Sequence, residues 1–228
     1  MKLLRTVRGR EGIGDSRIYI IIAVFILAVV IITFILSSNT LTSAYVPDMI
    51  LDNGWSENLE ERDSGSTFFG LEKWSSITYD NDNERYPAFL SVISKKSLIL
   101  MNEEELSELA LSTIENAIQE NMIIDYNSLN SGERVTNNSH QTNFFIYDCI
   151  DNSSNSSELI KIIGEVWNCG NSGSSIICIG FAQITDNEHN NTEINTLYWN
   201  KIIRDSEGTF GFGDLQNNDG IIFNIICH

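Results

Sequence analysis

The stretch EVWNCGNSGSSIICIGFA, residues 165–182, holds two apolar runs on either side of a short polar segment. That segment, GNSGSS, is rich in glycine and serine, the residue types that favour tight turns. The runs around it extend to ELIKIIGEVWNC and SIICIGFAQIT. Their length and their many β-branched residues are typical of central strands. The stretch therefore predicts an antiparallel hairpin at the centre of a sheet.

Two cysteines, Cys169 and Cys178, flank this turn, and the chain has two more, Cys149 and Cys227. The sequence lacks the paired short spacings that zinc sites favour. An even number of cysteines after a long apolar segment favours disulfides in an oxidising compartment. We expect Cys169–Cys178 across the hairpin and Cys149–Cys227 around a larger loop. Four cysteines allow three pairings, so the spacing leaves the other two open.

Further strand and helix patterns lie on both sides of the hairpin. The runs TFFGLEKWSSITYD, YPAFLSVISKK, TNFFIYDCI and GIIFNIIC predict strands, and NSLNSGERV predicts a turn. The clearest helix starts after Asn102, which forms a capping box with Glu105 and precedes apolar residues at helical spacing. A shorter second helix is predicted in NTLYWNKIIRDSEG. Together these elements predict an α+β domain, an antiparallel sheet with flanking helices, over residues 67–228.

The order of these elements, with SGERV leading to FFIYD, resembles the PsbP-like α/β/α sandwich and archaeal membrane-anchored surface proteins of unknown role. The resemblance covers residues 67–228. It implies a binding or assembly module and brings no catalytic residue with it.

The N-terminal run IYIIIAVFILAVVIITFIL, residues 18–36, contains no charge, proline or glycine. A helix rises about 1.5 Å per residue, so this run spans about 28 Å, close to the hydrocarbon thickness of a bilayer. We therefore expect a transmembrane helix over residues 18–36. A cleaved signal peptide is the alternative, although its apolar region is usually shorter.

Basic residues precede this run, and they set its expected orientation. Lys2, Arg5, Arg8, Arg10 and Arg17 lie before it, and the first basic residue after it is Arg62. By the positive-inside rule, residues 1–17 form a cytoplasmic segment and the remainder lies outside the cell membrane. Residues 37–66 are then a stalk between the membrane and an extracytoplasmic domain at 67–228.

The net charge of the chain limits its partners, and its asparagines offer glycosylation sites. The formal net charge is −17, which excludes nucleic acid as a partner because phosphate binding needs a basic surface. Four asparagines head N-x-Ser/Thr sequons, where an extracytoplasmic domain is open to glycosylation. They are Asn137, Asn152, Asn155 and Asn190.

One loop offers oxygen ligands for a metal ion. In YDNDNERYP, the carboxylates of Asp80, Asp82 and Glu84 alternate with asparagines, a composition that suits Ca²⁺. Arg85 and Ser91 stand where an EF-hand loop needs glycine and glutamate, so a turn with solvated charges is the competing interpretation. The adjacent Cys227 and His228 are also metal-ligand types, but we expect Cys227 to be oxidised. No motif predicts an organic cofactor: GTFGFG lacks the lysine of a phosphate-binding loop.

These features favour a non-catalytic, single-pass surface module that binds a protein or polymer of the cell envelope. A pilin-like filament subunit is an alternative, because RGREG before Ile13 resembles an archaeal pilin processing site. An extracytoplasmic hydrolase is another alternative, and it needs an acid, a base and a nucleophile in one pocket. The three histidines, His140, His189 and His228, lie in or beside polar loops without a recognisable catalytic motif.

Overall fold

The computed structural model describes residues 24–27, 40–51, 54–67, 70–81, 88–152, 157–185, 199, 202 and 220–228. The chain divides into two compact units, Met1–Thr40 and Leu41–His228. Of the apolar run 18–36 in the first unit, only residues 24–27 are described, and they are helical. The rest of the predicted transmembrane segment lies outside the described residues.

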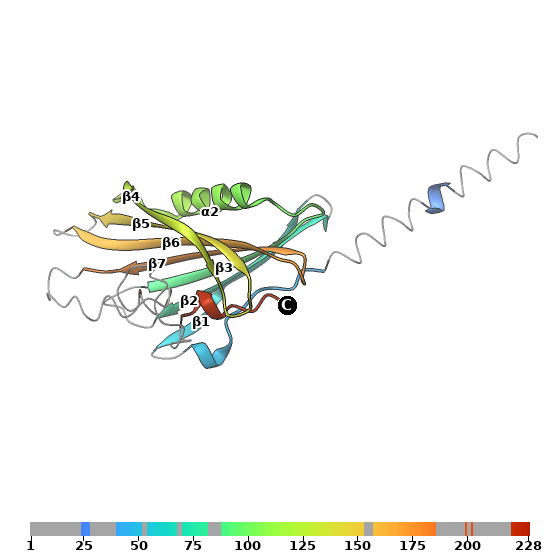
Figure 1. Cartoon of the computed structure of the whole chain (residues 1–228), viewed down its shortest axis with the longest axis horizontal. Helices are drawn as coiled ribbons and strands as arrows, with labels where there is room; N and C mark the ends of the chain where they lie inside the picture. Colours follow the sequence, from blue (N-terminus) through green and yellow to red (C-terminus); the bar gives the residue numbers. More distant parts are fainter. Residues whose placement is uncertain are drawn as a thin grey trace, which may run out of the picture. The chain divides into compact units, whose positions relative to one another are not determined.

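The second unit is built on a seven-stranded antiparallel sheet (Figure 1). The strand order is β1-β2-β3-β7-β6-β5-β4, so β7 returns to pair with β3 and joins the two halves of the sheet. The strands are β1 (Trp55–Thr67), β2 (Glu72–Asn81), β3 (Ala88–Lys96), β4 (Met122–Val135), β5 (Gln141–Asp151), β6 (Glu158–Cys169) and β7 (Ser174–Gln183).

The predicted central hairpin is confirmed as β6 and β7. It pairs from Ile160–Gln183 to Cys169–Ser174, and its turn closes with Gly173 N–H donating to the Cys169 carbonyl at 2.8 Å. Gly173 has a φ of 62°, a left-handed conformation that glycine adopts without strain.

The predicted first helix is confirmed as α2 (Glu103–Ala117). The Asn102 side chain accepts from Glu105 N–H at 2.9 Å, and the Glu105 carboxylate accepts from Asn102 N–H at 3.0 Å. The predicted capping box is therefore present. Three apolar residues of the helix, Leu106, Ala110 and Ile114, are fully buried against the sheet.

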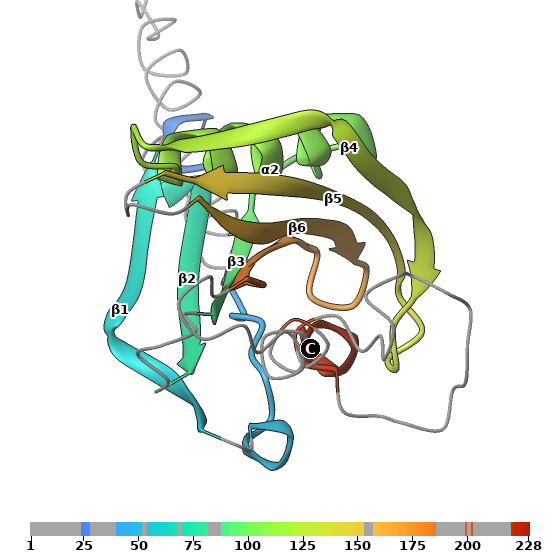
Figure 2. The ribbon, with the colours of Figure 1, turned by 90° about the vertical axis from the view of Figure 1, so that its left-hand side faces the viewer.

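Alternation along the strands divides the core between the two faces of the sheet. On one face, Ile162 and Val166 of β6 and Ile177 of β7 pack with α2. On the other face, Ile163 and Trp167 pack with the chain segments 44–46 and 221–227. Figure 2 shows α2 on one side of the sheet and the C-terminal segment on the other.

The expected α+β fold with an N-terminal transmembrane helix is wrong. The protein is mainly a seven-stranded antiparallel sheet, and α2 is the one helix of seven or more residues in the part of the chain that the structure describes. Within those same residues, no helix combines the length and the apolar character needed to cross a bilayer. The predicted second helix lies outside the described residues apart from Trp199 and Ile202.

Several segments expected as connections belong to the fold. The expected stalk, 37–66, contributes a 3₁₀ helix, η1 (Asp48–Ile50), and most of β1, whose Trp55 is buried. The expected turn NSLNSGERV lies within β4, which has a register shift between Asp125 and Asn130. β1 and β4 are the two edge strands, and their many exposed positions hide the apolar alternation that identifies inner strands.

The segment GIIFNIIC is also not the expected strand. It forms the 3₁₀ helix η3 (Ile222–Asn224), followed by a single bridge between Ile226 and Tyr45. Its apolar residues are buried because the segment covers one face of the sheet, and this burial does not need extended pairing.

Candidate functional site

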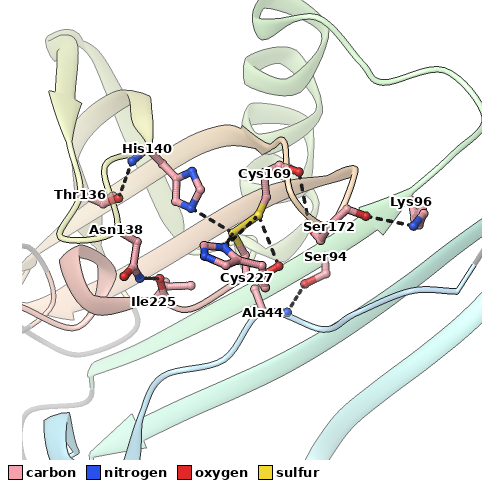
Figure 3. Close-up of a disulfide and its surroundings, with 11 residues drawn as sticks. Ala44, Ser94, Lys96, Thr136, Asn138, His140, Cys169, Ser172, Ile225 and Cys227 are labelled. Atoms are coloured by element: carbon pink, nitrogen blue, oxygen red, sulfur yellow. Dashed lines mark hydrogen bonds between the residues drawn. A yellow bond between two sulfur atoms is a disulfide. The ribbon is translucent and has the colours of Figure 1, made fainter.

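The cysteines pair differently from the expected pattern. Cys169 at the end of β6 is bonded to Cys227, 58 residues later, and their Cα atoms are 6.4 Å apart (Figure 3). Cys149 and Cys178 are buried free thiols. The expected Cys169–Cys178 and Cys149–Cys227 bridges are therefore wrong.

The register of the hairpin explains this difference. Cys178 lies opposite Glu165, whereas Cys169 lies opposite Ser174, so the two cysteines are four strand positions apart on β6 and β7. Cys149 packs in the core on the α2 side, while Cys227 packs on the other face of the sheet. Neither expected pair is close enough for a bond.

Two histidines direct ring nitrogens at this disulfide. His140 Nε2 lies 3.3 Å from Cys227 Sγ (Figure 3). His228 Nδ1 lies 3.7 Å from Cys169 Sγ and 3.8 Å from Cys227 Sγ. The four possible ligand atoms of these residues all lie within 4.8 Å of one another. Residues from three separate parts of the chain, at positions 140, 169 and 227–228, thus form one compact group, which we call the Cys–His cluster.

The turn between β4 and β5 holds His140 in place. His140 donates its backbone N–H to Thr136 Oγ1 at 3.2 Å and accepts from Thr136 N–H at 3.0 Å. The turn is also bonded to the segment that carries Cys227. Asn137 N–H donates to the Phe223 carbonyl at 2.9 Å, and Asn138 Nδ2 donates to the Ile225 carbonyl at 2.8 Å.

Other contacts fix the two cysteines. The segment 220–228 is paired to the start of the domain by two hydrogen bonds of 2.9 Å between Tyr45 and Ile226. On the opposite side, Lys96 Nζ donates to the Ser172 carbonyl at 2.9 Å, which ties the turn after Cys169 to β3 (Figure 3). The segment 220–228 is therefore held by hydrogen bonds to the β4–β5 turn and to Tyr45, and by the disulfide to the end of β6.

The rings of the cluster differ in their surroundings. His140 is half-buried and stacks on Trp167, with ring centroids 6.4 Å apart, while His228 is exposed. Burial, and then the neighbouring His228, lower the pKa of His140, which favours its neutral ring. Both sulfurs belong to fully buried residues. The exposed side of the cluster is thus the side of His228.

A buried ion pair lies deeper on the same face of the sheet. Glu165 is completely buried, and its carboxylate accepts from Arg134 Nε at 2.8 Å, from Arg134 Nη2 at 2.5 Å and from Thr142 Oγ1 at 2.6 Å. Burial, and then the Glu165 charge, raise the pKa of Cys178 well above its ordinary value. The Cys178 thiol is therefore protonated and unreactive at neutral pH.

The predicted calcium ligands are not brought together in the described part of the chain. Asp80 lies in β2, where its Oδ2 accepts from Asn58 Nδ2 of β1 at 2.8 Å. Asp82 and Glu84 lie outside the described residues. The calcium site stays a prediction.

Two of the four predicted glycosylation sites are described, and both asparagines are exposed. Asn137 Nδ2 donates to Asn224 Oδ1 at 3.1 Å, and Asn152 Oδ1 accepts from Ser157 Oγ at 2.7 Å. Asn155 and Asn190 lie outside the described residues. Glycosylation stays a prediction at all four positions.

A second feature is an open pocket of about 530 Å³ between α2, β4 and β5. The first turns of α2 contribute Glu103, Glu104 and Glu108, and β4 contributes Glu133. The aromatic rings of Phe145 and Tyr147 are 5.9 Å apart and form part of its wall. None of the described residues that line this pocket is basic.

Comparison of the chain with protein families, curated proteins and solved structures found no match. The resemblance to PsbP-like proteins and archaeal surface proteins stays a prediction.

The sequence reasoning missed both features as sites. The only sequence signal for the Cys–His cluster was the adjacent pair Cys227 and His228, because His140 and Cys169 are distant in the chain. For the pocket there was no sequence signal, because the sequence does not show that β4 and β5 pass beside the glutamates at the start of α2.

Proposed function

We propose that residues 41–228 form a non-catalytic binding module that acts outside the cytoplasm, at the cell envelope. The pocket between α2, β4 and β5 receives a segment of a partner protein that carries both positive charge and apolar side chains. The observation that carries this proposal is the composition of the pocket wall, which combines four glutamates with aromatic rings and has no basic residue among its described lining.

The physical reason is complementarity of charge and of apolar surface. Carboxylates at the rim attract lysine or arginine side chains, and their alkyl stems cover the aromatic wall. The net charge of −17 adds a long-range attraction for a basic partner. The Cys169–Cys227 bond supports an oxidising compartment, where disulfides persist. Contact of the protein with a membrane stays a prediction, and no helix among the described residues is long and apolar enough to span a bilayer.

Binding of a synthetic peptide of alternating lysine and leucine tests the pocket, with a glutamate–leucine peptide as the comparison. Glu104→Gln combined with Glu108→Gln should weaken binding of the lysine peptide about fivefold, the effect of losing two partly exposed ion pairs. Isothermal titration calorimetry measures this change.

The matched control is Glu60→Gln combined with Glu61→Gln, which removes the same charge from exposed positions on β1. This control should bind like the unmodified protein. Equal weakening by both double variants would show that only the net charge attracts the peptide. Binding of the glutamate peptide with the same affinity would also refute the proposed pocket.

The two alternative functions keep their own tests. A pilin-like subunit would have Ile13 as the first residue of the mature protein, which N-terminal sequencing identifies. A hydrolase would need its catalytic groups in one pocket, whereas His140 lies in the Cys–His cluster and does not line the pocket described above.

A further inference from the structure

The Cys–His cluster contains the ligand set of a metal centre, and this set was not assigned from the sequence. Two sulfurs and two imidazole nitrogens are the ligands of tetrahedral Cys₂His₂ zinc sites. In such a site, Zn–S bonds of about 2.3 Å and Zn–N bonds of about 2.0–2.1 Å place sulfur and nitrogen about 3.5 Å apart. The three sulfur–nitrogen distances observed here are 3.3, 3.7 and 3.8 Å.

The disulfide does not by itself explain the direction of the rings. A disulfide sulfur has no hydrogen to donate and is a weak acceptor, so it offers little to two imidazoles. Yet both His140 and His228 direct a ring nitrogen at the same pair of sulfurs. The centroids of the two rings are 5.6 Å apart in an edge-to-face arrangement, and the four possible ligand atoms of the cluster lie within 4.8 Å of one another.

The hydrogen bonds that hold the residues of the cluster in place also suit a metal centre. Ligands bind a metal tightly when other contacts hold them in position. The turn that carries His140 is bonded to the segment 220–228 through Asn137 and Asn138. That segment carries Cys227 and is bonded in turn to Tyr45. These contacts do not involve the four ligand atoms, so they persist when the sulfur–sulfur bond is opened.

We propose that Cys169, Cys227, His140 and His228 bind one Zn²⁺ ion when the Cys169–Cys227 disulfide is reduced. A dithiol reductant supplies two electrons and two protons to the two sulfurs and leaves as its own disulfide. Zn²⁺ then binds both sulfurs as thiolates, and the two thiol protons go to solvent. The ion and the disulfide exclude each other, since each uses the same two sulfurs.

Titration of the purified full chain with Co²⁺, which reports tetrahedral thiolate ligation through its visible absorption, tests this proposal. The chain is first reduced by a trialkylphosphine, which takes oxygen from water to become the phosphine oxide, and is then handled without air. We expect one equivalent of Co²⁺ to bind with tetrahedral and thiolate-to-metal bands, and Zn²⁺ to displace it. The unreduced chain should show neither band.

Single variants assign the ligands. Cys227→Ser should abolish the bands. His140→Ala or His228→Ala should weaken Co²⁺ binding at least about tenfold, because even mutation of a residue that hydrogen-bonds to a metal ligand reduces metal affinity by that factor. The controls are Cys178→Ala, which removes a thiol outside the cluster, and His189→Ala, which removes the remaining histidine. Both controls should bind Co²⁺ like the unmodified chain.

Each contrary result overturns the proposal. Absence of the bands after reduction would exclude the centre, and retention of full affinity in both histidine variants would reduce it to a simple dithiol site. Circular dichroism of the unreduced His140→Ala chain, which keeps its disulfide, shows whether that variant folds.

Protection of Cys169 and Cys227 from alkylation in the unmodified chain provides a second measurement. After reduction, Zn²⁺ should slow alkylation of Cys169 and Cys227 at least about tenfold, as mass spectrometry of their peptides can measure. If reduction unfolds the chain, Zn²⁺ should restore folding, because metal binding and folding are coupled in such sites. Failure to protect or to restore would refute the site.

Discussion

Glu165 is the residue whose role depends most on its neighbours. It lies in the middle of β6 and is completely buried, so an unpaired carboxylate there would be strongly unfavourable. Arg134 and Thr142 satisfy it with hydrogen bonds of 2.5 to 2.8 Å. The sequence shows only a glutamate in an apolar run, and nothing local to it identifies Arg134 as its partner.

Removing Arg134 should therefore destabilise the fold strongly. Arg134→Ala leaves the Glu165 carboxylate buried without its countercharge, and we expect a loss of about 3–5 kcal/mol in the free energy of unfolding. Urea denaturation followed by circular dichroism measures this loss. The matched control is Lys161→Ala, which breaks the partly exposed Lys161–Asp148 pair and should cost at most about 1 kcal/mol. Equal losses in the two variants would contradict a special role for the buried pair.

At the scale of the elements, the inner strands and α2 follow their local sequence patterns. The β6–β7 hairpin has β-branched residues on both faces because both faces are covered, by α2 on one side and by the chain segments near the two ends of the domain on the other. α2 begins where its capping box predicts. The edge strands β1 and β4 were missed because their exposed residues carry no such pattern.

A glycine in β6 shows how closely the sheet packs beneath α2. Gly164 pairs with Phe145, and a Cβ added at Gly164 would lie 2.6 and 2.7 Å from two carbons of the Phe145 ring. Gly164→Ala should therefore lower the free energy of unfolding by about 1–3 kcal/mol, the usual cost of overpacking a core. Thermal or urea denaturation measures the change.

Gly170 provides the control for this substitution. It lies exposed in the β6–β7 turn, and an added Cβ would meet nothing within 4 Å. Gly170→Ala should change stability by less than about 0.5 kcal/mol. A similar effect at the two positions would show that the Phe145 ring moves aside without cost.

At the scale of the whole molecule, the single disulfide and the two buried thiols predict how many cysteines react with a thiol reagent before and after reduction. Without reductant, the chain unfolded in denaturant should react with two equivalents of a thiol reagent, at Cys149 and Cys178. The folded chain should react slowly, because burial of both thiols raises their pKa and prevents access. After reduction the unfolded chain should react with four equivalents.

Ellman's reagent in denaturant, with and without prior reduction, gives this count. No reaction before reduction would mean two disulfides, as first expected from the sequence, and four equivalents would mean none. Peptide mapping by mass spectrometry should place the single bridge between Cys169 and Cys227.

The sequence by itself determined the central hairpin, the strands β2 and β3, the strand TNFFIYDCI and the capped start of the helix. Each of these depends on residues a few positions apart, whose alternation or capping acts within one element. Only the tertiary structure decided the Cys169–Cys227 pairing, the edge strands and the Cys–His cluster. His140 and Cys227 are 87 positions apart, and they meet because the β4–β5 turn bonds to the segment 220–228. Contacts of that range depend on how whole elements pack, and no local pattern of side chains encodes them.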